Sequence, residues 1–236
     1  MQTPPQTTIL SSATASRVAG ALADLGAVRL AGGQPFIYTS GWASPVYVDT
    51  RLLMSDVEAR TRVMDIAARH LRAHVAGLDA GLGAGLDAIV GAESTGIAFG
   101  AWIAERLGLP FLYLRKKPMG WGNAARLEGR LPAGARVLFV DDVTTDGRSK
   151  IAAAAALRQS GTRVADVLVV LDYGIYPGSA ARLADEGLTL HALTDWPALL
   201  AALRGRAATP PEALANLDAF TADPVAWSVA NGGVGA

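Results

Sequence analysis

The sequence predicts an α/β fold in which a central, mostly parallel sheet is flanked by helices. From residue 88 onward, short apolar runs alternate with stretches of helical periodicity, as in a chain of strands and helices. The apolar runs are continuous rather than alternating with polar residues, which is typical of strands buried on both faces. The 236 residues, 51% of them hydrophobic, suffice for one domain of this class with a substantial core.

The expected elements follow from local patterns along the chain. Short apolar runs predict strands at 36–38, 46–48, 88–91, 111–114, 136–140, 164–171 and 188–193. Helical periodicity predicts helices at about 9–30, 55–75, 96–107, 148–159 and 178–186. Glycine-rich and polar stretches predict connecting loops at 39–45, 77–87 and 116–130. About the last thirty residues are rich in alanine and proline, which predicts one or two surface helices and a loose tail.

The helix expected at 55–75 has a specific start signal. Ser55 and Glu58 match a capping box, in which Ser55 bonds the backbone three residues on and Glu58 reaches back. The periodicity turns four apolar side chains of this helix inward: Met64, Ala67, Leu71 and Val75.

Composition and charge exclude several classes of function. The formal net charge is zero, so no global basic field indicates a nucleic-acid partner. The chain has no cysteine, which excludes disulfides, thiolate metal sites and cysteine nucleophiles. The polar N-terminus lacks the pattern of a signal peptide, and no apolar stretch is long enough to span a bilayer. We therefore expect a soluble, cytoplasmic protein with no membrane partner.

Two adjacent carboxylates, Asp141 and Asp142, follow the strand expected at 136–140. In an open α/β sheet, ligands bind where the strands end at their carboxyl side. Each carboxylate can accept two hydroxyl hydrogen bonds, which suits a polyhydroxylated ligand. The pair also suits a hydrated Mg²⁺, in a weaker way and through water.

Residues 143–149, which we call the phosphate loop, come directly after these carboxylates. Thr144, Thr145, Gly147 and Ser149 supply hydroxyls and backbone N–H groups at a helix N-terminus, which form a cradle for a phosphate. A diol site followed at once by a phosphate site describes a ribose 5-phosphate. The competing interpretation is a strand end with an ordinary helix cap, and the length of the whole run after a buried strand argues against it.

The segment 137–149 resembles the PRPP-binding signature of the type I phosphoribosyltransferases. Within that group the chain resembles orotate phosphoribosyltransferase over about residues 22–200. The resemblance implies the type I phosphoribosyltransferase fold with a small N-terminal hood over the base site. It implies one domain over 1–236, made of a polar tail at 1–8, the hood at 9–54, the core at 55–200 and C-terminal helices with a tail at 201–236.

Residues 39–51 resemble the family element that lies over the base. Tyr47 offers an aromatic face to a flat ring, and Ser44 with the turn amides can meet a carboxylate. An ordinary hairpin turn rich in glycine, serine and proline accounts for the same residues, so both interpretations stay open at this point.

Two further loops resemble those that hold pyrophosphate in the family. Residues 90–98, the pyrophosphate loop, place backbone amides near Ser94, Thr95 and Gly96, although a tight strand-to-helix turn fits the same residues. Residues 114–129 resemble the mobile catalytic loop, with a solvated basic hairpin as the alternative. Three consecutive cations in it face the charge that builds on departing pyrophosphate: Arg115, Lys116 and Lys117.

The sequence departs from the family pattern at several positions. Lysine often stands where this chain has Met119, and a thioether cannot stabilise pyrophosphate, so Lys117 is the candidate substitute. The other departures are Thr39 for lysine, Trp121 for histidine and Tyr173 for an arginine that touches orotate in some members.

The resemblance implies a Mg²⁺-dependent enzyme that acts as a homodimer, in which each subunit's loop completes its neighbour's site. The implied reaction joins orotate to PRPP and yields orotidine 5′-monophosphate and pyrophosphate, a step of de novo UMP (pyrimidine) synthesis. No side chain need act as a nucleophile, so positioning and charge stabilisation carry the catalysis. Two rivals stay open: a phosphoribosyltransferase for another base, and a catalytically impaired PRPP-binding paralogue or regulator.

The resemblance also assigns a role to each candidate residue. Catalytic roles fall to Arg115, Lys116, Lys117, Asp141 and Asp142. PRPP contacts fall to Ser94, Thr95, Gly96, Asp141, Asp142, Val143, Thr144, Thr145, Asp146, Gly147, Arg148 and Ser149. Base contacts fall to Ser44, Tyr47, Thr145 and Tyr173. No residue is expected to bind a metal directly, and Asp146, unusual beside a phosphate, is expected to cap the helix or to point away.

Other patterns do not support a site of their own. His70 and His74 stand four apart on an expected helix, but no third ligand and no zincin glutamate accompany them, so no metal site is expected there. His191 lies in an apolar strand and is expected to be a core or rim histidine. The glycine-rich segment 81–85 precedes a strand rather than following one, which excludes a dinucleotide fingerprint.

Overall fold

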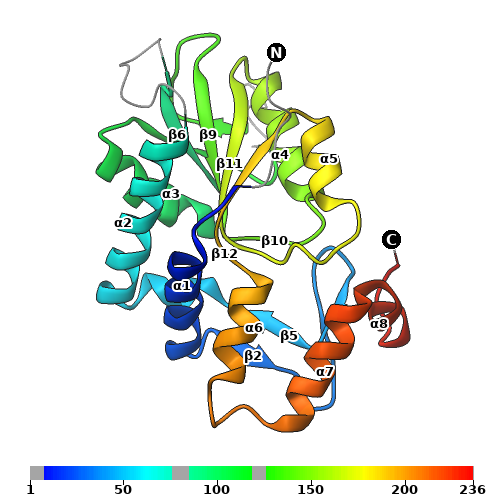
Figure 1. The fold of residues 1–236 in the computed structure, drawn as a ribbon. Helices are drawn as coiled ribbons and strands as arrows, with labels where there is room; N and C mark the ends of the chain where they lie inside the picture. Colours follow the sequence, from blue (N-terminus) through cyan, green and yellow to red (C-terminus); the bar gives the residue numbers. More distant parts are fainter. Residues whose placement is uncertain (1–7, 76–84, 119–125, 236) are drawn as a thin grey trace.

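The structure, a computed structural model, describes residues 8–75, 85–118 and 126–235 (Figure 1). Neighbouring strands of its main sheet are parallel, except that β8 is antiparallel to β7. A short strand, β10 (Val143–Thr144), pairs with β11 in parallel. The predicted α/β fold with a mostly parallel sheet is therefore confirmed. The strand order is β1 (Thr8–Ile9), β12 (Thr189–Asp195), β11 (Arg163–Asp172), β9 (Arg136–Val140), β6 (Ala88–Ala92), β7 (Phe111–Leu114) and β8 (Leu127–Glu128).

Alternate residues of the central strands face two separate hydrophobic clusters. In β9, Leu138 and Val140 pack into the cluster that includes α1, α2, α3 and α6, whereas Val137 and Phe139 pack into the cluster that includes α4 and α5. Figure 1 shows α2 and α3 on one side of the sheet and α4 and α5 on the other. This burial on both faces is the physical reason for the continuous apolar runs in the sequence. The helices are α1 (Ser12–Asp24), α2 (Val57–His74), α3 (Thr95–Leu107), α4 (Arg148–Gln159), α5 (Ser179–Asp185), α6 (Trp196–Arg204), α7 (Pro211–Ala222) and α8 (Pro224–Ala230).

The strands and helices predicted from residue 88 to 193 are confirmed, with ends that differ by at most one or two residues. The loop predicted at 116–130 contains strand β8 near its end, and its residues 119–125 lie outside the described residues. Helix α4 begins and ends where its periodicity predicts. The loop expected at 77–87 lies mostly outside the described residues. In the part of the chain that the structure describes, no helix combines the length and the apolar character needed to cross a membrane.

The helix predicted at about 9–30 is wrong in its extent. Helix α1 ends at Asp24, and Val28–Leu30 forms strand β2. Gly26 adopts a left-handed conformation at φ 66°, which helix interiors do not accommodate. The amide of Ala27 then donates to the carbonyl of Leu22 at 2.9 Å, closing the helix in the manner of a glycine C-cap.

The capping box predicted at Ser55 is also wrong. Asp56 is the N-cap of α2, because its Oδ1 accepts from the amide of Ala59 at 2.8 Å. Ser55 Oγ instead donates to the carbonyl of Leu52 at 3.1 Å. The apolar residues of this helix are buried as expected: Met64, Ala67, Leu71 and Val75.

The hood contains two short antiparallel ladders below the main sheet. Strand β2 pairs with β5 (Val46–Val48), and β3 (Phe36–Ile37) pairs with β4 (Ala43–Ser44), while a 3₁₀ turn (Thr50–Met54) leads into α2. The C-terminal helices α7 and α8 lie beside these ladders in Figure 1.

The C-terminal tail is anchored to the hood, so the predicted loose tail is wrong. The amide of Val234 donates to the carbonyl of Gly41 at 3.0 Å. Ser228 Oγ, in α8, accepts from the amide of Ala43 at 3.0 Å and donates to the carbonyl of Val234 at 2.7 Å. The local sequence of the tail carries no sign of these partners, because they lie more than 180 residues away.

Candidate active site

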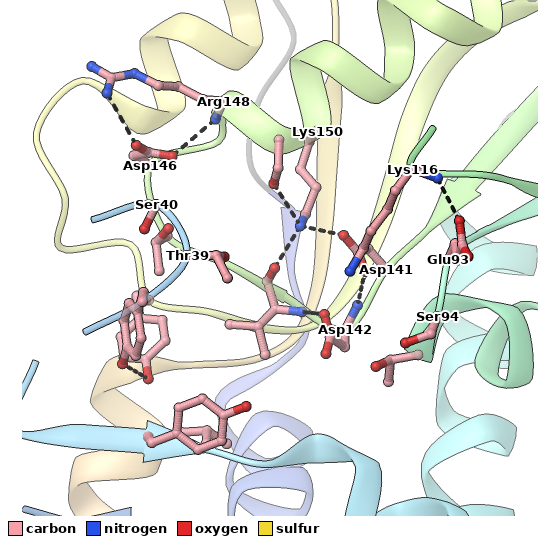
Figure 2. A pocket seen from close by; sticks show the side chains of 18 of the residues that line it. Thr39, Ser40, Glu93, Ser94, Lys116, Asp141, Asp142, Asp146, Arg148 and Lys150 are labelled. Atoms are coloured by element: carbon pink, nitrogen blue, oxygen red, sulfur yellow. Dashed lines mark hydrogen bonds and ion pairs between the residues drawn. The ribbon is translucent and has the colours of Figure 1, made fainter. Parts of the chain in front are cut away.

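A cavity of about 590 Å³ opens where strands β6, β9 and β10 end and the hood begins (Figure 2). The loops that follow two adjacent parallel strands lie at the same edge of the sheet, so residues distant in sequence meet here. Its wall is formed by Ile37, Tyr38, Thr39, Ser40, Tyr47, Val48, Glu93, Ser94, Thr95, Lys116, Asp141, Asp142, Val143, Thr145, Asp146, Arg148, Ser149, Lys150 and Tyr173.

The carboxylates of Asp141 and Asp142 begin the loop after β9. Asp141 Oδ1 accepts from the amide of Asp142 at 2.9 Å, and Asp142 Oδ1 accepts from the amide of Val143 at 2.8 Å. Thr50 Oγ1 donates to Asp142 Oδ2 at 3.4 Å. Burial, and then the neighbouring charge of Asp141, raises the pKa of Asp142 to about 6.

The phosphate loop turns from β10 into the first turn of α4. Gly147 has φ 81°, and a Cβ there would lie 3.2 Å from Leu183 Cγ and 3.4 Å from Ser179 Oγ, so the turn calls for glycine. At this helix start the amide of Arg148 donates to Asp146 and that of Lys150 donates to the carbonyl of Gly147, whereas the amides of Gly147 and Ser149 have no acceptor among the described residues and are available to an anion. Thr145 and Ser149 line the cavity, whereas Thr144 is buried behind it.

Asp146 lies on the cavity wall, and its carboxylate is bonded to the hood and to the start of α4. Its Oδ1 accepts from the amide of Arg148 at 3.1 Å, and its Oδ2 accepts from Trp42 Nε1 at 3.3 Å. The guanidinium of Arg148 lies 3.6 Å from the same carboxylate. Asp146 thus bonds the amide of the first residue of α4, although the N-cap of that helix is Gly147 and the carboxylate remains on the cavity wall.

The pyrophosphate loop and the catalytic loop meet at Glu93. Glu93 Oε2 accepts from the amide of Lys116 at 2.7 Å, so the end of β6 is tied to the end of β7 (Figure 2). Ser94 and Thr95 line the cavity. Gly96 lies behind them, and a Cβ on it would stand 2.4 Å from the carbonyl oxygen of Val140. This close approach lets α3 begin directly against β9.

The three cations of the catalytic loop are placed differently. Lys116 lines the cavity, and its side chain points toward Asp141 and Asp142 in Figure 2. Arg115 forms an ion pair with Glu128 at 3.6 Å, across the β7–β8 ladder. Lys117 is exposed and is not part of the cavity wall. Met119 and Trp121 lie outside the described residues.

Aromatic side chains form the wall opposite the phosphate loop. Tyr38 Oη donates to the carbonyl of Val46 at 2.5 Å and lies 2.8 Å from Tyr173 Oη. Since the single proton of Tyr38 goes to Val46, the hydroxyl of Tyr173 is the donor between the two rings. Burial raises the pKa of Tyr38 to about 12 and that of Tyr173 well above its usual value, so both stay neutral.

Tyr47 is half-buried on this wall and packs against Phe36, with ring centroids 5.7 Å apart. Ser44 is fully buried behind the wall. Its Oγ donates to the carbonyl of Val46 at 2.9 Å and accepts from the amide of the same residue at 3.2 Å. The structure thus places Ser44 where it shapes the hood and not where it meets a ligand.

Most sequence-predicted site residues come together in this cavity, and a few do not. Those behind or away from the wall are Ser44, Gly96, Arg115, Lys117, Thr144 and Gly147. The sequence interpretation gave no site role to seven residues of the wall: Ile37, Tyr38, Thr39, Ser40, Val48, Glu93 and Lys150. A signal for Lys150 was present, because a lysine in the first turn of α4 can fold back over the loop that precedes it.

The three histidines lie away from the cavity wall. His70 and His74 stack with ring centroids 4.3 Å apart, and His191 is buried, as expected for a core histidine. Among the described residues, no three histidine, aspartate or glutamate side chains are grouped in a way that could hold a metal ion.

The chain is similar in sequence to proteins named orotate phosphoribosyltransferase. It is 41% identical over 224 residues to that of Jannaschia sp. (strain CCS1), which covers 94% of this chain and 95% of the relative. It is 42% identical over 213 residues to that of Dinoroseobacter shibae, which covers 90% and 92%. No family model matches the chain.

Solved structures share the fold. The orotate phosphoribosyltransferase of Aeropyrum pernix superposes with a TM-score of 0.64 at 29% identity, over 79% of this chain and 99% of that one. The UMP synthase of Leishmania donovani superposes with a TM-score of 0.75 at 26% identity, over 89% of this chain. The chain spans 43% of that longer protein.

Proposed function

The chain belongs to the orotate phosphoribosyltransferase family, and we propose that it joins orotate to PRPP, forming orotidine 5′-monophosphate and pyrophosphate. The reaction is a step of de novo pyrimidine synthesis, on the way to UMP. The observation that carries this proposal is that two carboxylates, residues of the phosphate loop and aromatic side chains line one cavity.

The ribose 5-phosphate half of PRPP matches the loop after β9. Asp141 and Asp142 accept hydrogen bonds from the ribose hydroxyls, because each carboxylate oxygen keeps a lone pair beyond its present partner. The 5-phosphate takes backbone amides and the hydroxyls of Thr145 and Ser149 at the start of α4. Gly147 and Thr144 act by shaping the turn.

The base lies between the phosphate loop and the hood. Tyr47 covers the flat ring, and Tyr173 on the cavity wall supplies a neutral surface where some family members have an arginine. The N1 nitrogen of orotate attacks the anomeric carbon as the bond to the pyrophosphate oxygen breaks. The enzyme forms no covalent bond of its own, so it acts by holding the two reactants in line.

Cations meet the negative charge that builds on the departing pyrophosphate. Lys116 is the catalytic-loop cation on the wall in the described part of the chain, and Ser94 and Thr95 hold the diphosphate from the other side. Arg115 and Lys117 reach the site through movement of the catalytic loop, which the glycines at positions 120, 122 and 129 of the sequence permit.

The site fits a Mg²⁺ ion that arrives with PRPP. Asp141 and Asp142 carry hard carboxylate oxygens and would hold the ion through water, while phosphate oxygens of PRPP would bind it directly. When bound, the ion neutralises charge on the pyrophosphate. We further propose that the protein is a cytoplasmic homodimer in which the catalytic loop crosses to the neighbouring subunit. We also propose that its single domain is divided into the hood at 9–54, the core at 55–200 and the C-terminal helices with the tail at 201–236.

The test is the consumption of orotate, followed by its absorbance, with PRPP and Mg²⁺ present. Asp142→Asn should lower kcat/KM by about a hundred-fold, because charge-assisted hydrogen bonds to the ribose are lost. Asp218→Asn is the matched control, since Asp218 is an exposed carboxylate paired with Arg204 far from the cavity. A wild-type protein that binds PRPP and consumes neither orotate, uracil nor purines would be a binding protein, and the proposal would fail.

A further inference from the structure

Lys150 is a lysine inside the molecule, on the first turn of α4. Its side chain is 3% exposed, yet its ammonium group lies at the wall of the cavity (Figure 2). Buried lysines are uncommon, because removing an ammonium from water is costly unless it is fully paired. The partners of this group therefore decide what it does.

The ammonium uses all of its protons within the protein. Nζ donates to Asp141 Oδ2 at 2.6 Å, to the carbonyl of Val143 at 2.7 Å and to Ser149 Oγ at 3.2 Å. An ammonium has three N–H donors and no acceptor, so these partners saturate it. Lys150 has no proton left to donate to a phosphate, and it is not a direct ligand in this arrangement.

The contact with Ser149 determines the direction of the serine hydroxyl. Because Ser149 Oγ accepts from Lys150, its own proton points elsewhere, and the exposed side of this residue faces the cavity. The serine is thereby presented as a donor to an anion at the start of α4.

The contact with Asp141 holds the other half of the ribose site. Asp141 Oδ1 is fixed by the amide of Asp142, and Oδ2 is fixed by Lys150, so the plane of the carboxylate is held at both oxygens. The bond to the carbonyl of Val143 ties the same ammonium to the start of the phosphate loop.

We propose that Lys150 is a positioning residue for PRPP, which orients the Asp141 carboxylate for the ribose hydroxyls and the Ser149 hydroxyl for the 5-phosphate. The inference deepens the proposed function and rests on it. A purely structural lysine would hold the loop together and, when removed, would affect both substrates and the stability alike. A positioning lysine affects PRPP and leaves orotate binding nearly unchanged.

Lys150→Met tests this difference, because methionine fills a similar volume without the charge or the donors. We expect the KM for PRPP and the Kd for ribose 5-phosphate, measured by calorimetry, to rise about ten-fold or more, with the KM for orotate changed less than about two-fold. Arg158→Met is the matched control: it removes a cation with its ion pair to Glu186 from the other end of α4, and both KM values should stay as in the wild type.

A double-mutant cycle with Ser149→Ala separates the two contacts. If Lys150 acts partly through the serine, Lys150→Met should weaken ribose 5-phosphate binding less in the Ser149→Ala background than in the wild type. Should Lys150→Met fail to fold, Lys150→Arg takes its place. The planar guanidinium cannot reproduce three donors in the same directions, so it should bind ribose 5-phosphate more weakly than the wild type.

Two results would overturn the inference. One is ribose 5-phosphate binding and a KM for PRPP that match the wild type in every Lys150 variant that folds. The other is an equal rise in both KM values together with a loss of thermal stability. A wild-type protein that binds ribose 5-phosphate in a Lys150-dependent way but does not consume orotate would leave the inference standing and defeat the proposed function instead.

Discussion

Trp42 Nε1 donates a hydrogen bond to Asp146 Oδ2 at 3.3 Å, which joins the hood to the phosphate loop across 104 residues of sequence. Both residues are buried, with Trp42 2% and Asp146 4% exposed. The same carboxylate accepts from the amide of Arg148, the first residue of α4, so one side chain joins the hood to the end of the phosphate loop. Several expectations depend on such links between the two halves of the site.

Asp146→Ala removes both bonds at once. We expect the free energy of unfolding to fall by about 1–2 kcal/mol, because a helix cap is lost and the indole N–H is left without a partner. The KM for PRPP should rise several-fold as the phosphate loop loosens. Urea unfolding and steady-state kinetics measure the two effects. Asp56→Ala, at the N-cap of α2, is the control and should lower the stability by a similar amount while the KM for PRPP stays unchanged. If the KM for PRPP also rose in Asp56→Ala, the effect of Asp146 on PRPP binding would be refuted.

Ser228→Ala separates α8 from the hood. The serine is fully buried and bonds both the amide of Ala43 and the carbonyl of Val234, so its loss should reduce stability by about 1–3 kcal/mol. Because the loop it supports contains Thr39 and Ser40 of the cavity wall, the KM for orotate should rise more than that for PRPP. Thr221→Ala, in α7, is the control, because it loses the bond from Trp196 of α6. Equal kinetic effects in both variants would show that only stability is involved.

The loss of activity on the acid side of the pH profile should report the protonation of Asp142. Its pKa is raised to about 6, so kcat/KM for PRPP should fall as the pH drops through about 6 and the carboxylate that meets the ribose becomes protonated. Burial also raises the pKa of Asp172 to about 6, but this residue is not on the cavity wall. Asp172→Asn should therefore leave this loss of activity unchanged, and a shift of the loss to another pH in this variant would assign it to Asp172 instead.

His70 should make the protein less stable in acid. Burial, and then the charges of His191 and His74, lowers the pKa of His70 to about 4, from 6.5 as the ordinary value. The unfolded chain therefore binds a proton first, and stability is lost as the pH falls from about 6.5 toward 4, by up to about 3 kcal/mol.

The comparison of wild type with His70→Gln, by urea unfolding at pH 7 and 4.5, isolates this contribution. The contribution of His70 to the pH dependence of stability has the opposite sign to the contributions of Asp142 and Asp172. The raised pKa values of these two carboxyls make the folded state bind protons more readily than the unfolded chain between pH 6 and 4, so they increase stability as the pH falls. Identical pH dependence in the two proteins would exclude His70 as the source.

The sequence by itself determined the elements whose signal is local. Strand β9 and helix α4 were predicted at their observed bounds, because a strand buried on both faces must be continuously apolar and an amphipathic helix must repeat its apolar residues. The carboxylates and the phosphate loop are contiguous in the chain, so their chemistry was visible as a motif. Asp146 was expected to turn away from a phosphate for the simple reason that like charges repel.

Only the tertiary structure decided which of those residues face the cavity. Ser44 and Tyr47 stand three residues apart in the hood, yet one is enclosed by the backbone of Val46 and the other lines the wall. Lys150 became part of the site by folding back onto Asp141, and the tail was fixed by Gly41 and Ala43 from the opposite end of the chain. Such contacts depend on packing between distant segments, which local periodicity and composition do not encode.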